Sequence, residues 1–211
     1  CEVFDILTTK NKIQAVDTSQ GLIGCEKLGL AVSGHTSHLA SMVGLRLPLE
    51  SHPLQALVSE PIKPVMPTVV MSNKVHVYLS QSDKGELVIG AGIDAYNSFS
   101  QKGGFNIIRE QLAALIELFP IVSRLRMLRQ WAGIVDVSPD ASPLICLTPV
   151  RGLYINGGWG TGGFKATPGS GHLFAHTIAL DKPHIKNLAF DLERFSNGAL
   201  IPEHGAAAVA H

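Results

Sequence analysis

Five of the seven residues from Gly157 to Gly163 are glycine. The apolar run Leu153 to Asn156 precedes this loop and predicts a strand, and the stretch from Gly169 to Leu180 follows it and predicts a helix. Glycine adopts positive φ and lets backbone N–H groups approach a flat or charged ligand, because it has no Cβ. The loop therefore predicts either a tight strand-to-helix connection or a backbone that contacts a ligand.

Lys165 follows the glycines at the mouth of the expected helix, which we place from about Pro168 to Ser170 onward. A helix N-terminus carries partial positive charge, so an adjacent ammonium favours an anion such as a ligand carboxylate. The spacing Gly158-x-Gly160-x-x-Gly163 formally matches the dinucleotide fingerprint. That fingerprint requires a following strand and an acidic residue about 20 positions on. Because the chain instead reaches Asp181-Lys182-Pro183, we do not assign a pyrophosphate to this loop.

The composition excludes several classes of partner. Lys+Arg and Asp+Glu both number 17, so no global charge draws the chain to nucleic acid or to an anionic membrane. No apolar stretch approaches the roughly 18 residues of a transmembrane helix. The cysteines Cys1, Cys25 and Cys146 have neither CxxC spacing nor an even count, so we predict no disulfide framework and no structural zinc. A reduced, cytoplasmic protein is expected.

The rest of the chain predicts mixed strands and helices. A hairpin is expected around the turn Thr8 to Lys12, and a strand, glycine turn and short helix over 28–42. Five prolines from Pro48 to Pro67 favour extended segments such as Leu54 to Ser59. Further predicted elements are a hairpin over 75–93, an amphipathic helix over 105–119, a strand over 131–137 and a final amphipathic stretch with Leu188, Leu192 and Phe195 on one face.

Four other patterns are weaker candidates for a functional site than the glycine loop and Lys165. His172 and His176 are spaced i, i+4, but no third ligand is nearby in the sequence and no HExxH pattern is present, which favours a structural or solvated pair. Ser33-Gly34-His35 lacks a GxSxG elbow and is interpreted as a turn and cap.

Asp136 and Asp140 flank a proline turn and are expected to bond local backbone. His52 and Trp159 are second-rank candidates for lining a substrate cavity, with core packing equally plausible.

The segment Gly158–Gly171 (GWGTGGFKATPGSG) resembles the C-terminal flavin-loop signature of the β subunit of heterotetrameric sarcosine oxidases. The segments 51–60, 85–94 and 133–143 are also similar to that family. The resemblance spans nearly the whole chain but only about the C-terminal half of the family's subunit. Since residue 1 is Cys within an expected strand, and the amino-terminal GxGxxG loop has no counterpart, we expect an N-terminal part of a longer protein to be absent.

The resemblance implies an α+β fold. An incomplete α/β flavin-binding layer would be formed by residues 1–47 and 146–211, with an antiparallel-sheet substrate-binding domain inserted over 48–145. The implied activity is the oxidation of sarcosine to glycine by noncovalent FAD, with release or transfer of a one-carbon unit. In the family, electrons pass to a covalent FMN and then to oxygen, forming hydrogen peroxide, while partner subunits carry NAD and folate sites.

Two alternatives stay open: an enzyme similar to dimethylglycine oxidase or dehydrogenase, and a non-catalytic fragment that lacks the phosphate-binding loop.

The family's FMN-bearing histidine lies upstream of Cys1, so none of the nine histidines is assigned to FMN. The oxygen-activating lysine of the monomeric relatives aligns with Val88, and their substrate-binding tyrosine and histidine align roughly with Val135 and Gly92. These differences are consistent with oxygen reacting at a second flavin.

Lys165 aligns with the lysine that holds the substrate carboxylate in related monomeric amine oxidases, so we expect it to bind both cofactor and substrate. Such a contact orients the substrate and requires no dedicated base. No metal is expected. The cofactor contacts implied by the resemblance are Val3, Gly160, Thr161, Gly162, Gly163, Phe164 and Lys165.

Overall fold

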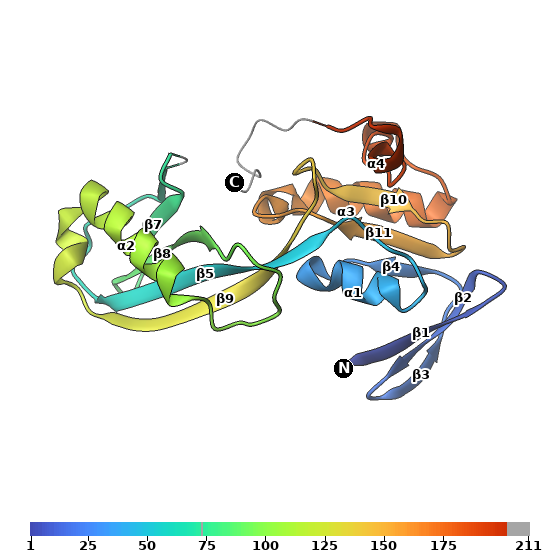
Figure 1. Cartoon of the computed structure of the whole chain (residues 1–211), viewed down its shortest axis with the longest axis horizontal. Helices are drawn as coiled ribbons and strands as arrows, with labels where there is room; N and C mark the ends of the chain where they lie inside the picture. The colour runs from blue at the N-terminus through green and yellow to red at the C-terminus, as the bar shows by residue number, and fades with distance from the viewer. Residues whose placement is uncertain (73, 202–211) are drawn as a thin grey trace. The chain divides into compact units, whose positions relative to one another are not determined.

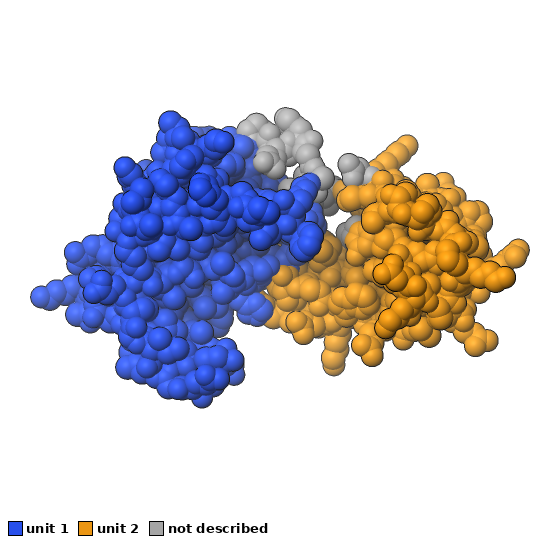
Figure 2. All heavy atoms as spheres, turned by 180° about the vertical axis from the view of Figure 1, so that it is seen from behind, with its two compact units in different colours: residues 1–51, 135–209 blue, residues 52–134, 210–211 orange. Residues whose placement is uncertain are grey.

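The computed structural model describes residues 1–72 and 74–201, and these residues form two compact units. The described part of unit 1 comprises residues 1–51 and 135–201, and unit 2 comprises residues 52–134 apart from residue 73 (Figure 2, blue and orange). The boundaries therefore lie after residues 51 and 134, compared with 47 and 145 expected from the sequence. Which unit binds flavin and which binds substrate stays a prediction.

Unit 1 contains two three-stranded sheets (Figure 1). The first is antiparallel, in the order β1-β2-β3, and its tight turn has Lys10 and Asn11 at positive φ, which confirms the N-terminal hairpin. The second has the order β10-β11-β4, with β4 parallel and β10 antiparallel to β11. The elements are β1 (Val3–Thr9), β2 (Lys12–Thr18), β3 (Gly21–Gly24), β4 (Leu28–Leu30), η1 (Ser33–His35), α1 (Thr36–Ser41), β10 (Leu144–Leu147), β11 (Leu153–Gly157), α3 (Gly163–Leu180), η3 (Ile185–Asn187) and α4 (Arg194–Asn197).

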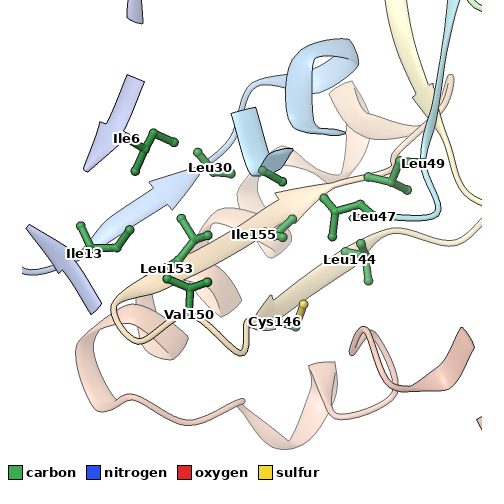
Figure 3. Close-up of a cluster of buried hydrophobic side chains, with 11 residues drawn as sticks. Ile6, Ile13, Leu30, Leu47, Leu49, Leu144, Cys146, Val150, Leu153 and Ile155 are labelled. Atoms are coloured by element: carbon green, nitrogen blue, oxygen red, sulfur yellow. The ribbon is translucent and has the colours of Figure 1, made fainter. Parts of the chain in front are cut away.

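Helix α3 covers one face of the β10-β11-β4 sheet. At Gly29 in β4, an added Cβ would lie 3.0 Å from the Phe174 ring and 3.2 Å from Ile178, so helix and strand are in close contact. The opposite face carries a core shared with α1 and with strands β1 and β2. Strand alternation produces this division, because successive side chains point to opposite faces. The labelled core residues are Ile6, Ile13, Leu30, Leu47, Leu49, Leu144, Cys146, Val150, Leu153 and Ile155 (Figure 3).

Helix α3 begins at Gly163, several residues before the start predicted from the sequence. Pro168 was expected to mark that start, but it lies inside the helix. A proline has no N–H for the carbonyl of residue i−4, which here is Phe164. The hydroxyl of Thr167 donates to the Phe164 carbonyl at 2.8 Å instead, so the carbonyl is satisfied and the helix continues through the proline.

The predicted final amphipathic stretch is wrong as a single element. The chain forms two short helices, η3 and α4, and the side chain of Leu188 is 53% exposed. Leu192 and Phe195 do pack against the unit 1 core. Arg194, the first residue of α4, is buried and makes the polar contacts described below.

Unit 2 is a five-stranded sheet in the order β6-β7-β8-β5-β9, with α2 against β7 and β8 (Figure 1). The predicted hairpin over 75–93 and the helix over 105–119 are both confirmed. Its core joins Leu57, Leu79 and Ile89 from the sheet to Ile108 and Leu115 from α2. The elements, of which β5 and β9 extend into unit 1, are β5 (Glu50–Pro61), β6 (Val70–Ser72), β7 (Val77–Gln81), β8 (Glu86–Ile93), α2 (Phe105–Leu118), η2 (Pro120–Arg124) and β9 (Met127–Val137).

Over the residues that the structure describes, no helix combines the length and apolarity needed to cross a membrane. Cys1, Cys25 and Cys146 are free thiols. Burial raises the pKa of the Cys146 thiol to about 12, so this cysteine is a packing residue and not a nucleophile.

Candidate functional site

The glycine loop, residues 157–163, connects β11 to α3 within unit 1. Its first glycines are required by close packing. An added Cβ on Gly157 would lie 2.8 Å from the Thr36 hydroxyl oxygen, and one on Gly158 would lie 3.0 Å from Leu49. Gly158 and Gly160 also have positive φ, of 74° and 51°. The tight-connection interpretation therefore accounts for the first half of the loop.

The N–H groups of three loop glycines are used inside the protein. The Gly158 N–H donates to the Asp136 carboxylate at 2.6 Å, and the Gly160 N–H donates to the Asp136 carbonyl at 2.8 Å. The Gly162 N–H donates to the Trp159 carbonyl at 2.9 Å. An external ligand must therefore be met chiefly by the N–H groups that follow, in the first turn of α3.

That first turn consists of Gly163, Phe164 and Lys165 and has the character of an anion site. The first N–H groups of an α-helix have no partner within the helix. Gly162, the N-cap residue, makes no side-chain capping bond, and the first turn contains no acidic residue. The Lys165 side chain is exposed, and Phe164 is 97% exposed. Partial positive charge and a full ammonium thus lie together at the surface of unit 1.

Trp159 serves as packing beneath this turn. Its indole N–H donates to the Asn156 side-chain oxygen at 2.7 Å, and an added Cβ on Gly163 would lie 3.1 Å from the Trp159 Cβ. Of the other predicted contacts, Val3 pairs with Thr18 in β2, and His52 of unit 2 has its Nδ1 3.0 Å from the Asp94 carbonyl oxygen. Cofactor binding by Val3 and substrate contact by His52 stay predictions.

The structure adds a third histidine to the pair found in the sequence. The His184 ring lies 4.9 Å from that of His176 and 6.2 Å from that of His172, measured between centroids. Among the described residues, however, no group of three metal-ligating side chains has a geometry that could hold an ion. Burial and the neighbouring histidines lower the pKa of His184, whose Nδ1 accepts the Lys186 N–H and caps η3.

Asp136 and Asp140 both bond backbone, but the prediction of local backbone is confirmed only for Asp140 and Ser142, because Asp136 accepts the Gly158 N–H from 22 positions away. Asp140 accepts the N–H groups of Ser142 and Ile201 at 3.2 and 3.1 Å. No signal in the sequence points to the partners Thr36 and Arg194, which lie 100 and 54 positions away from these carboxylates. The segment Ser33–His35 forms the short helix η1 that leads into α1, which confirms the predicted turn, but the predicted cap is wrong in that His35, the N-cap residue of α1, makes no side-chain capping bond.

Comparison with known proteins shows the family of this chain. A model of FAD-dependent oxidoreductases matches residues 1–177. The chain belongs to this family. It is 58% identical over 211 residues to the sarcosine oxidase subunit beta of Arthrobacter sp, covering 100% of this chain and 52% of that protein. The same subunit of Rhodobacter capsulatus is 54% identical over 210 residues, covering 100% and 50%. The chain thus spans about half the length of these relatives.

Solved structures of the family share the fold. An L-proline dehydrogenase from P. horikoshii has a TM-score of 0.85 at 28% identity, covering 95% of this chain and 55% of the other. A glycine oxidase from Geobacillus kaustophilus has a TM-score of 0.79 at 23% identity, covering 92% and 52%. These similarities agree with the predicted α+β class.

The residues of the loop fit the FAD that the family implies. A flat, electron-rich ring edge is complemented by backbone N–H donors that no Cβ obstructs. The first turn of α3 supplies backbone N–H donors, of which that of Gly163 has no Cβ beside it, without a neighbouring acidic side chain, and Lys165 adds a cation.

Proposed function

We propose that this chain is part of a sarcosine oxidase beta subunit that oxidises sarcosine to glycine with noncovalent FAD, forming hydrogen peroxide and a one-carbon unit that is released or transferred. Support comes from the Arthrobacter and Rhodobacter relatives, which match over the whole chain. When bound, FAD would supply the electron chemistry: it would take a hydride from the N-methyl carbon, water would hydrolyse the resulting imine to glycine and formaldehyde, and molecular oxygen would take up the two electrons as hydrogen peroxide.

The observation that carries the proposal is the place of Lys165. Its exposed ammonium stands in the first turn of α3, directly after the glycine loop, so its charge and that of the helix N-terminus act on the same side of unit 1. Lys165 binds the substrate carboxylate by an ion pair and so fixes the orientation of the amine against the cofactor. Lys165 binds and orients, and it transfers no proton.

The remaining parts of the proposal concern the assembly. Unit 1 contributes the flavin-binding layer, and unit 2 contributes the substrate-binding sheet. Other subunits, which carry NAD and folate sites, associate with this one in the cytoplasm, and FMN is held by a group other than the nine histidines of this chain. The word subunit in the names of the relatives supports an assembly of several chains.

The test is the substitution Lys165→Met in the full-length, FAD-loaded protein. We expect kcat/KM for sarcosine to fall about 100-fold or more, because the substrate carboxylate loses its ionic partner. For an N-methylamine without a carboxylate, the same substitution leaves kcat/KM nearly unchanged. Lys182→Met is the matched control, since it removes an exposed lysine just beyond the other end of α3.

Equal loss with both substrates, or no loss with either, contradicts the assignment of Lys165. A substrate profile of the unmodified protein separates sarcosine from dimethylglycine: a higher kcat/KM for dimethylglycine overturns the proposed substrate.

A further inference from the structure

Asp136 is a buried carboxylate attached to the glycine loop. It lies near the end of β9 and is 2% exposed. One of its oxygens, Oδ2, accepts the Gly158 N–H at 2.6 Å and lies 3.1 Å from the Thr36 hydroxyl oxygen. A buried carboxylate is costly unless it is hydrogen-bonded, so these contacts define where the side chain must be.

The main chain at the end of β9 holds the loop at two further points. The Asp136 carbonyl accepts the Gly160 N–H at 2.8 Å, and Val137 forms an antiparallel bridge with Trp159. Three consecutive loop residues are therefore bound by two consecutive strand residues. Gly158 and Gly160, whose N–H groups donate to Asp136, both have positive φ, and Phe164 in the first turn of α3 that follows them is exposed.

Thr36 joins this arrangement to helix α1. It is fully buried, and its hydroxyl oxygen lies 2.6 Å from the Ser33 carbonyl oxygen as well as 3.1 Å from Asp136 Oδ2. The hydroxyl has one proton for these two acceptors. The approach is so close that Gly157 has no room for a side chain, because an added Cβ would lie 3.0 Å from the Asp136 carboxylate.

We propose that Asp136 is a positioning residue for the cofactor loop, which it holds through the amides of Gly158 and Gly160. Held in this way, the first turn of α3 presents its N–H groups and Lys165 to the flavin in one arrangement. The inference rests on the proposed function, because it requires the loop to contact flavin. Asp136 touches neither cofactor nor substrate and acts through the backbone of the loop.

The test compares Asp136→Ala with Asp140→Ala in the full-length protein. Asp140 is the matched control, because it is a second buried carboxylate of unit 1, four positions along the chain, with none of its hydrogen bonds to the loop. Amide hydrogen exchange of residues 157–163 is measured in the apoprotein, and the FAD dissociation constant is measured by titration.

For Asp136→Ala, we expect the loop amides to exchange about tenfold faster or more, and FAD to bind about tenfold more weakly. Asp136→Asn keeps an acceptor oxygen and is expected to stay within about threefold of the original protein in both measurements. Asp140→Ala lowers the melting temperature but leaves both quantities within about threefold. A purely structural role for Asp136 predicts instead that the two alanine variants behave alike.

Unchanged exchange and FAD affinity in Asp136→Ala overturn the inference, and so do equal changes in Asp140→Ala. If Asp136→Ala does not fold, Thr36→Val provides the test, because valine has the same shape without the hydroxyl. Faster loop exchange in Thr36→Val supports the inference, and unchanged exchange overturns it. The Lys165→Met experiment tests the proposed function separately. If Lys165→Met loses turnover while the loop amides of Asp136→Ala exchange at the original rate, the role of Asp136 is rejected and the proposed function stands.

Discussion

Two buried carboxylates of unit 1, Asp140 and Asp136, hold their surroundings in different ways. Asp140 forms an ion pair with Arg194, at 2.7 and 3.0 Å, and both side chains are 2% exposed. Asp136 accepts from a backbone amide and lies against a hydroxyl. The ion pair closes the turn 138–142 against the C-terminal segment, whereas the amide contact shapes a loop whose outer side stays open. The ion pair of Asp140 stabilises the fold, and the hydrogen bond of Asp136 determines the conformation of the glycine loop.

The ionisation of Asp140 reflects its closed setting. Burial opposes ionisation of the carboxyl group, but hydrogen bonds from the Arg194 guanidinium and the Ile201 N–H outweigh it and lower the pKa of Asp140 to about 2. Arg194 also donates to the carbonyls of Asp191 and Ser142 and stacks on the Phe195 ring. The hydrogen bonds of the Arg194 guanidinium therefore hold the C-terminal segment in place.

The largest effect is expected for Arg194→Met. Removing the cation leaves Asp140 buried without its ionic partner, which costs about 3–5 kcal/mol in the free energy of unfolding. Chemical denaturation measures this loss, while FAD affinity is expected to change less than about threefold. Arg151→Met, which removes an exposed arginine bonded to the Lys10 carbonyl, is the control with a loss below about 0.5 kcal/mol. A loss below about 1 kcal/mol for Arg194→Met would contradict the closed ion pair.

The next effect is the pH dependence of stability. The pKa of Asp140 is lower in the folded chain than its ordinary value of 3.8, so its contribution is present above about pH 4 and is lost as the pH falls through about 2. The loss between pH 5 and pH 2 amounts to about 2 kcal/mol. The unfolding free energies of the original protein and of Asp140→Asn are measured across this range. The decrease between pH 5 and pH 2 should be smaller in Asp140→Asn by that amount. Parallel pH curves for the two proteins would contradict the lowered pKa.

The smallest effect sharpens the contrast between loop and helix. Gly171 lies in the interior of α3, and an added Cβ meets no atom within 4 Å, so Gly171→Ala is expected to raise the stability of the 211-residue chain by up to about 1 kcal/mol. The control is Gly158→Ala, where φ is +74° and Leu49 lies 3.0 Å away, and this substitution should destabilise. Thermal unfolding of both variants measures the two changes in stability. Stabilisation by both substitutions would show that position 158 does not require glycine.

Local patterns in the sequence were sufficient for much of the secondary structure. The hairpin turns, the amphipathic helix α2 and the strand before the glycine loop are confirmed, because each depends on residues close together in the chain. The short strands β3, β6 and β10 were not predicted, whereas the equally short β4 was, because its residues belong to the longer apolar run 28–32. The predicted start of α3 was wrong because the Thr167 hydroxyl donates to the Phe164 carbonyl in place of the N–H that Pro168 lacks. Helix propensities of single residues do not represent such a hydrogen bond.

The sequence by itself determined the glycine loop, the lysine that follows it and the expectation that Asp136 and Asp140 bond local backbone. Only the tertiary structure decided that Asp136 accepts the Gly158 amide, whereas Asp140 accepts those of Ser142 and Ile201. It also decided that Thr36 and Arg194 are the side-chain partners, and that His184 joins His172 and His176. The physical reason is that hydrogen bonds and ion pairs act over a few ångströms of space. Residues separated by 54 or 100 positions share them only after β-strand pairing and helix packing have brought their backbones together.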